Sequence, residues 1–163
     1  MSEIVIEPPE RDDVEELTDL WVELARSQQA FGTHLLAEEN EQNARETVLQ
    51  QLLTGACRVA RADGSIVGFV TFGEDSEGYA QDVTRGFVHN LYVRSAYRNR
   101  GIGSKLLAAA ERALRERGAE AIALQVMAPN EAARRFYRRH GYEPHRIEFE
   151  KSTGSDNLTT DDE

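Results

Sequence analysis

Apolar residues recur along this chain at two spacings, one typical of helices and the other of strands. Intervals of three and four residues predict helices over residues 12–27, 44–53, 102–117 and 131–140. Apolar and β-branched runs predict strands over residues 4–6, 57–61, 66–72, 86–94, 121–127 and 142–150. Between two of these strands, Asp63-Gly64 is a strong signal for a hairpin turn. This order predicts an α/β sheet that begins antiparallel and contains a parallel pair around the helix at 102–117.

The strand at 86–94 leads into a loop with two glycines. The loop is Arg98-Asn99-Arg100-Gly101-Ile102-Gly103, and helical spacing begins directly after it. Glycine lets the backbone approach a ligand closely, and the first N–H groups of a helix attract an anion. Strand, loop and helix therefore predict an anion site. A nucleotide-binding site is the competing interpretation of a glycine loop. The sequence lacks its usual motifs, because it has neither the Lys-Ser/Thr ending of a phosphate loop nor a three-glycine pattern at the first strand.

Charge is distributed unevenly along the chain. The net charge is −10, yet residues 94–146 hold 12 of the 19 Lys and Arg and only 5 of the 29 Asp and Glu. A basic segment within an acidic protein suits a ligand with several negative charges, whereas the overall acidity argues against nucleic acid such as duplex DNA. Only Lys105 and Lys151 are lysines, and an acidic surface poor in lysine fits a halophilic source.

The length of 163 residues suits one domain with a substantial core. We expect this domain over residues 1–151, followed by a polar, acidic, disordered tail over residues 152–163. The sequence contains no run of about 18 apolar residues and no signal region, so we expect no membrane contact and a cytoplasmic location. The single Cys57 excludes an internal disulfide, and we expect a buried thiol and no metal site.

Three segments resemble the GNAT superfamily of acyl-CoA N-acyltransferases. Leu91-Tyr92-Val93 is similar to the strand end that lines the thioester and pantetheine in that family, and residues 98–103 match its Gln/Arg-x-x-Gly-x-Gly/Ala signature. From Asn130 to Tyr142 the sequence resembles the family pattern N-x-x-A-x-x-F-Y-x-x-x-G-F/Y. The likeness is strong over residues 88–144, and over residues 4–74 it is an agreement in element order.

The resemblance implies a fold. It implies a mixed, mostly antiparallel α/β sheet of six to seven strands with a central, splayed parallel pair, flanked by about four helices. It also implies a bulge near residues 91–93 that splays the parallel strands. A free backbone N–H in that splay could stabilise the oxyanion of a tetrahedral intermediate.

The resemblance also implies acetyl-CoA as the co-substrate. Backbone N–H groups of residues 99–104 would hold the pyrophosphate, and the main chain of residues 91–93 would bind the pantetheine arm like an added strand. Asn130 would bond to the pantetheine and also cap the helix that follows it. The residues expected to bind the cofactor are Leu91, Tyr92, Val93, Arg98, Asn99, Arg100, Gly101, Ile102, Gly103, Ser104, Asn130 and Tyr137.

Tyr137 is the expected catalytic acid. It lies seven residues after Asn130, which is two helical turns along the same face. In the family a tyrosine at this place faces the sulfur and can protonate the leaving thiolate. A phenol is a suitable donor at neutral pH.

The general base is left open by the sequence. An ammonium group of pKa about 10 must lose a proton before it can attack a thioester. The ribosomal-protein acetyltransferases of the superfamily carry a glutamate where this chain has Gln125, and an amide cannot act as a base. His89, expected on the same face as Leu91, is the preferred catalytic candidate because its ordinary pKa is near neutrality. Asp82, Glu77 and water are the alternatives.

The sequence thus predicts an N-acetyltransferase that moves an acetyl group to a primary amine by direct attack, without a metal or a covalent enzyme intermediate. Two alternatives stay open, a module that binds acyl-CoA without turnover and a transferase for a longer acyl chain. Glu38, Glu39 and Glu41 would attract a cationic amine, although halophilic adaptation explains the same acids. A homodimer also stays open, since residues 142–149 could pair strands.

Overall fold

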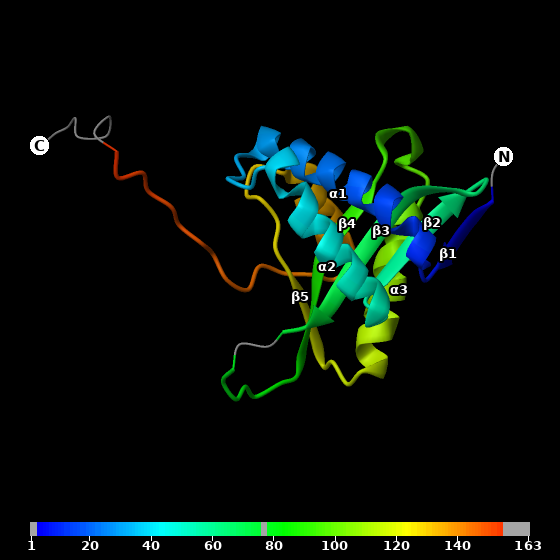
Figure 1. The fold of residues 1–163 in the computed structure, drawn as a ribbon. Helices are drawn as coiled ribbons and strands as arrows, with labels where there is room; N and C mark the ends of the chain where they lie inside the picture. Colours follow the sequence, from blue (N-terminus) through cyan, green and yellow to red (C-terminus); the bar gives the residue numbers. More distant parts are fainter. Residues whose placement is uncertain (1–2, 76–77, 155–163) are drawn as a thin grey trace, which may run out of the picture. The chain divides into compact units, whose positions relative to one another are not determined.

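The chain divides into two compact units. The computed structural model describes residues 3–75 and 78–154. Within these residues, the unit Met1–Pro129 holds a five-stranded sheet and three α-helices, and the unit Asn130–Glu163 holds the helix α4, Glu131–Arg139 (Figure 1). One domain over residues 1–151 stays a prediction, and residues 155–163 of the expected tail lie outside the described residues.

The sheet has the strand order β1-β2-β3-β4-β5. The bounds are Ile4–Glu7 for β1, Cys57–Ala62 for β2, Ser65–Glu74 for β3, Arg85–Val93 for β4 and Ala121–Leu124 for β5. The first four strands pair antiparallel and β4 pairs with β5 in parallel, which confirms the predicted arrangement. Between β2 and β3, Asp63 and Gly64 have φ of 53° and 84°, the left-handed conformation that a two-residue hairpin turn requires.

The helices form where the apolar spacing predicts them. α1 spans Val14–Gln28, α2 spans Glu41–Leu53 and α3 spans Ile102–Glu116. The helix α2 begins three residues before the predicted start, because its polar first turn carries no apolar signal while Glu41 favours a helix N-terminus. No helix of residues 3–75 and 78–154 is long and apolar enough to cross a bilayer.

The helices α1 and α3 cover opposite faces of the sheet in the first unit (Figure 1). Phe69 of β3 packs into the core beneath α1. Its neighbour Gly68 points to the other face, where an added Cβ would lie 3.2 Å from Leu106 of α3. On the same face, an added Cβ on Gly86 of β4 would lie 2.9 Å from Leu114. Glycine at these two positions lets α3 approach the strands closely.

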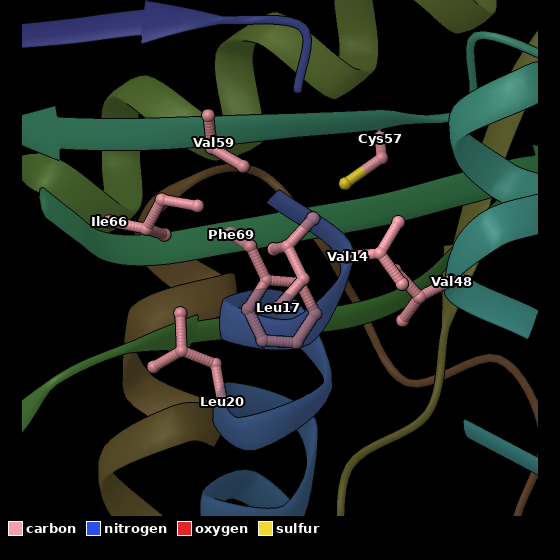
Figure 2. Close-up of a cluster of buried hydrophobic side chains, with 8 residues drawn as sticks. All are labelled: Val14, Leu17, Leu20, Val48, Cys57, Val59, Ile66 and Phe69. Atoms are coloured by element: carbon pink, nitrogen blue, oxygen red, sulfur yellow. The ribbon is translucent and has the colours of Figure 1, made fainter. Parts of the chain in front are cut away.

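A cluster of buried side chains joins α1 and α2 to β2 and β3 (Figure 2). Full burial of a Val, Leu, Ile or Phe side chain contributes roughly 1.5–3 kcal/mol to stability. Cys57 lies within this cluster, which confirms the expected buried thiol. The members of the cluster are Val14, Leu17, Leu20, Val48, Cys57, Val59, Ile66 and Phe69.

The strand count is lower than predicted. The strand β5 ends at Leu124 instead of residue 127, and residues 142–150 form no strand, so the described chain has five strands rather than six to seven. In the second segment Ile147 and Phe149 alternate with polar residues, but they are 71% and 92% exposed. Alternation alone does not form a strand, because the backbone needs a neighbouring strand and the apolar face needs a core.

Candidate active site

The strand β4 extends beyond the end of its parallel neighbour β5. The last rung of the β4–β5 ladder joins Val88 to Leu124. Beyond it β4 continues to Val93, and among the described residues it pairs there with β3 on one edge only. This is the splay that the family resemblance implies.

A bulge in β4 follows the last rung directly. Thr71 of β3 pairs with Asn90, and Phe72 pairs with Val88. His89 therefore has no opposite residue in β3 and is the extra residue of the bulge. The expected bulge is present, and it lies two residues before Leu91.

The backbone groups of Leu91 and Val93 point toward the splay. The N–H of Arg94 donates to the carbonyl of Val67 in 2.8 Å, so Arg94 faces the neighbouring strand. Because orientation alternates along an antiparallel strand, Tyr92 also turns its N–H and C=O toward β3, while Leu91 and Val93 turn theirs away. An extended ligand beside β4 can therefore pair with Leu91 and Val93, as expected for a pantetheine arm.

The bulge overturns the prediction that His89 and Leu91 share a face. Asn90 donates from Nδ2 to the hydroxyl of Thr71 in 2.9 Å, which places these two side chains on the face covered by α1. Leu91 consequently points to the opposite face. His89 instead packs against Phe87, with ring centroids 5.2 Å apart, on the same face as Asn90. The extra residue of the bulge resets the alternation that the prediction assumed.

The surroundings of His89 favour its neutral form. Partial loss of water around the ring lowers the pKa of His89, and the carboxylate of Asp75 opposes this shift. Asp75 is itself paired with Arg85 at 2.5 Å. The Nε2 atom lies 3.5 Å from where a Cβ would stand on Gly73, a neighbour that the sequence analysis missed. A glycine inside a predicted strand is the signal that could have identified such a close approach.

The glycine loop has the backbone shape of an anion site. Asn99 and Gly101 have φ of 64° and 79°. Gly101 is the N-cap of α3, and its carbonyl accepts from the N–H of Lys105 in 3.1 Å. The N–H groups of Ile102 and Gly103 come in the first turn, where no helical carbonyl precedes them. They can therefore bind a negatively charged group, assisted by the helix dipole.

The arginines of the glycine loop make contacts that hold its conformation, and they also give it positive charge. Arg98 donates from Nε to the carbonyl of Val93 in 2.8 Å, and its guanidinium lies 5.5 Å from the centre of the Tyr92 ring. Arg98 thus ties the loop to the end of β4. Arg100 lies 5.2 Å from the centre of the Tyr97 ring. Both side chains are exposed, so their charge remains available near the loop.

The second unit presents Asn130 and Tyr137 on one helix. Asn130 accepts the N–H of Ala133 at its Oδ1 in 3.1 Å, so it is the predicted N-cap of α4. The Nδ2 group of Asn130 is a further donor. Burial raises the pKa of Tyr137 to about 12, and its ring lies edge-on to Tyr142 at 5.8 Å. The phenol therefore keeps its proton at neutral pH.

The remaining base candidates are not gathered around His89 by any described contact. Asp82 is exposed in the connection between β3 and β4, and Glu77 lies outside the described residues. Gln125 is exposed and follows the end of β5 directly. Among the named candidates, His89 is the one located at the bulge.

A family comparison agrees with this arrangement. The model of the Acetyltransferase (GNAT) family matches residues 14–142. The chain belongs to the GNAT acetyltransferase family. It is an acyltransferase, which confirms that prediction against the alternative of a non-catalytic module. A relative from Archaeoglobus fulgidus, described as an uncharacterized N-acetyltransferase, is 29% identical over 128 residues, covering 78% of this chain and 85% of the relative.

Solved structures with low sequence identity share the GNAT fold. The PaiA N-acetyltransferase of Thermoplasma acidophilum, solved with coenzyme A, is 20% identical and has a TM-score of 0.74, covering 90% of this chain and 93% of its own. The aminoglycoside N-acetyltransferase AAC(6')-Iy, solved with CoA, is 19% identical and has a TM-score of 0.71, covering 94% of this chain and 97% of its own. These similarities concern the fold.

Proposed function

We propose that this GNAT protein transfers the acetyl group of acetyl-CoA to a primary amine by direct attack. The observation that carries the proposal is the coincidence of the β4 bulge with the last β4–β5 rung, Val88 to Leu124. This coincidence leaves a splay with backbone donors directly before the glycine loop. The structural relatives solved with CoA support the choice of donor.

The donor would bind along the open edge of β4. The pyrophosphate would accept hydrogen bonds from the N–H groups at the start of α3, after Gly101. The pantetheine arm would pair with the carbonyl of Leu91 and with the N–H of Val93, since the Val93 carbonyl already accepts from Arg98. The side-chain amide of Asn130 is proposed to bond to the same arm. These contacts orient the thioester without a metal.

The amine would be deprotonated before it attacks. His89 is proposed as the base, directly or through a water, because its lowered pKa leaves a free lone pair at neutral pH. The amine nitrogen then forms a bond to the thioester carbon, and the carbonyl electrons move onto oxygen. A backbone N–H that faces the splay, such as that of Leu91, would stabilise this oxyanion.

The intermediate would collapse with loss of the thiolate. The carbonyl re-forms, the carbon–sulfur bond breaks, and its electron pair stays on sulfur. Tyr137 is proposed to donate its phenolic proton in a hydrogen bond to that sulfur, because its pKa of about 12 keeps the proton in place beforehand. As the thiolate leaves, the nitrogen gives up its second proton and the sulfur takes up one proton, while the proton held by His89 returns to solvent. The products are a neutral amide and CoA as its thiol.

The first test is a titration with acetyl-CoA and with CoA. We expect micromolar binding by isothermal titration calorimetry, followed by amine-dependent release of thiol. The titration is run in low and in multimolar KCl, and a requirement for high salt would support a halophilic source. Absence of binding in both buffers would overturn the proposal. Comparison of acetyl-CoA with hexanoyl-CoA decides the acyl chain, and faster turnover of hexanoyl-CoA would refute the acetyl assignment.

A further inference from the structure

A pocket of about 340 Å³ lies beside His89 in the first unit. We propose that this pocket receives the acceptor, and that the acceptor is a small hydrophilic primary amine. This inference rests on the proposed acetyl transfer. The volume lies at the lower end of the range of about 300–1,000 Å³ for small-molecule sites. It suits a molecule of about amino-acid size.

The pocket lies on the correct side of the bulge for an acceptor. Gly73 and Glu74 line it, and they pair with Phe87 and Gly86 of β4, which precede His89. The glycine loop follows β4 at its other end. A donor that runs from the loop along the splay would present its thioester near the bulge, and an amine in the pocket would approach from the opposite direction. His89 would stand between the two and can take the proton.

The pocket wall formed by α2 is polar and uncharged. It consists of four side chains, from the middle of the helix to its C-cap, that carry hydroxyl or amide groups: Thr47, Gln50, Gln51 and Thr54. Thr47, Gln50 and Gln51 can both donate and accept a hydrogen bond, whereas the hydroxyl of Thr54 donates to the carbonyl of Gln50 in 3.0 Å and can only accept a further one. Such a wall suits hydroxyl, amide or carboxylate groups on the acceptor. An acceptor with only methyl groups would strip water from these side chains without replacing the hydrogen bonds.

Two charged groups complete the pocket. Glu74 is exposed and contributes a carboxylate, which attracts an ammonium group. Arg117 donates from Nη2 to the carbonyls of Thr54 and Gly55, in 2.9 and 3.1 Å, which fixes it at the rim. Its guanidinium lies 5.6 Å from the centre of the Phe72 ring. Because Arg117 covers Phe72, which is buried, this ring gives an apolar acceptor little surface to bind.

The test compares two amines with the same skeleton. Serinol (2-amino-1,3-propanediol) and 3-aminopentane differ only by hydroxyl groups in place of methyl groups. We expect serinol to have a kcat/KM about tenfold or more above that of 3-aminopentane, after correction for the free-base fraction of each amine. The Gln51→Leu variant should lower kcat/KM for serinol about fivefold, in keeping with loss of one or two hydrogen bonds, and leave the KM for acetyl-CoA unchanged.

The matched control is Gln42→Leu, the same substitution on an exposed position of α2 outside the pocket lining. It should leave both amines unaffected. Equal kcat/KM for the two amines, or equal effects of Gln51→Leu and Gln42→Leu, would overturn this inference alone while other amines are still acetylated. Absence of thiol release with every amine would overturn the proposed function together with it.

Discussion

Val88 and Leu124 form the last rung between β4 and β5, and the bulged His89 follows Val88 directly. The position of this bulge in β4 therefore has two consequences. The parallel ladder ends beside the bulge, so that β4 has an open edge, and the bulge turns a titratable side chain to the face opposite Leu91. The pocket beside His89 and the glycine loop lie toward opposite ends of β4, so the two substrates can approach the bulge from different directions.

The phenol of Tyr137 gives the first prediction. Tyr137→Phe removes the proposed donor to the leaving sulfur while keeping the ring, so kcat should fall by about 100-fold and the Kd for CoA should stay unchanged. Stopped-flow thiol release and calorimetry measure the two quantities. Tyr79→Phe, at a residue that is 85% exposed, is the control. Unchanged turnover in Tyr137→Phe would remove Tyr137 from the mechanism.

The pH dependence of the reaction tests His89. Its pKa is below the ordinary 6.5, so the base is neutral above that pKa and kcat/KM should fall only as the pH drops through it. His89→Gln should lower kcat/KM by about 10- to 100-fold and abolish the acidic limb of the profile. The exposed His145→Gln variant should keep that limb. A limb that persists in His89→Gln assigns the base to another group.

Two glycines with similar positive φ angles allow an effect on binding to be distinguished from an effect on stability. Gly101 and Gly64 have φ of 79° and 84°, and an added Cβ at either position meets no atom of the described residues within 4 Å. Alanine at either site should therefore cost about 1 kcal/mol of stability, because L residues disfavour this region. Only Gly101→Ala should weaken CoA binding, measured by calorimetry beside thermal unfolding. Equal Kd values for the two variants would contradict an anion site at the loop.

A largely buried ion pair makes stability depend on pH. Arg61 holds Asp13 at 2.5 Å, and although burial raises the pKa of Asp13, Arg61 outweighs it and the net pKa is lowered. The contribution is present above the unfolded value of 3.8 and is lost as the pH falls through the folded pKa. Arg61→Met should cost about 2 kcal/mol near pH 7 and less near pH 3, by urea unfolding. Arg45→Met, which breaks a pair with the exposed Glu15, should cost under about 1 kcal/mol. Equal costs at both pH values would contradict the role of Asp13.

The thiol of Cys57 should be inert. Burial raises its pKa to about 12, so the thiolate is scarcely populated at neutral pH. We expect Ellman's reagent to react with it only as the protein unfolds in urea, and iodoacetamide to leave transfer activity intact. Rapid labelling of the folded protein would contradict the burial of Cys57.

The sequence by itself determined the local elements of this protein. The spacing of Val14, Leu17 and Leu20 predicts α1, and Asp63-Gly64 predicts the hairpin, because periodicity and turn chemistry depend on neighbouring residues. The sequence likewise predicts the succession of strand, glycine loop and helix and the N-cap at Asn130. The family resemblance also follows from the sequence. These features carry most of the candidate site.

Only the tertiary structure decided how strands align and end. The bulge at His89 depends on which residues of β3 lie opposite β4, and pairing register is a relation between distant segments. A shift of one residue exchanges the two faces, which is why the prediction that His89 shares the face of Leu91 was wrong. The absence of a strand over residues 142–150 of the described chain has the same origin. Its alternation of apolar residues is local, whereas a strand requires a partner that local sequence does not supply.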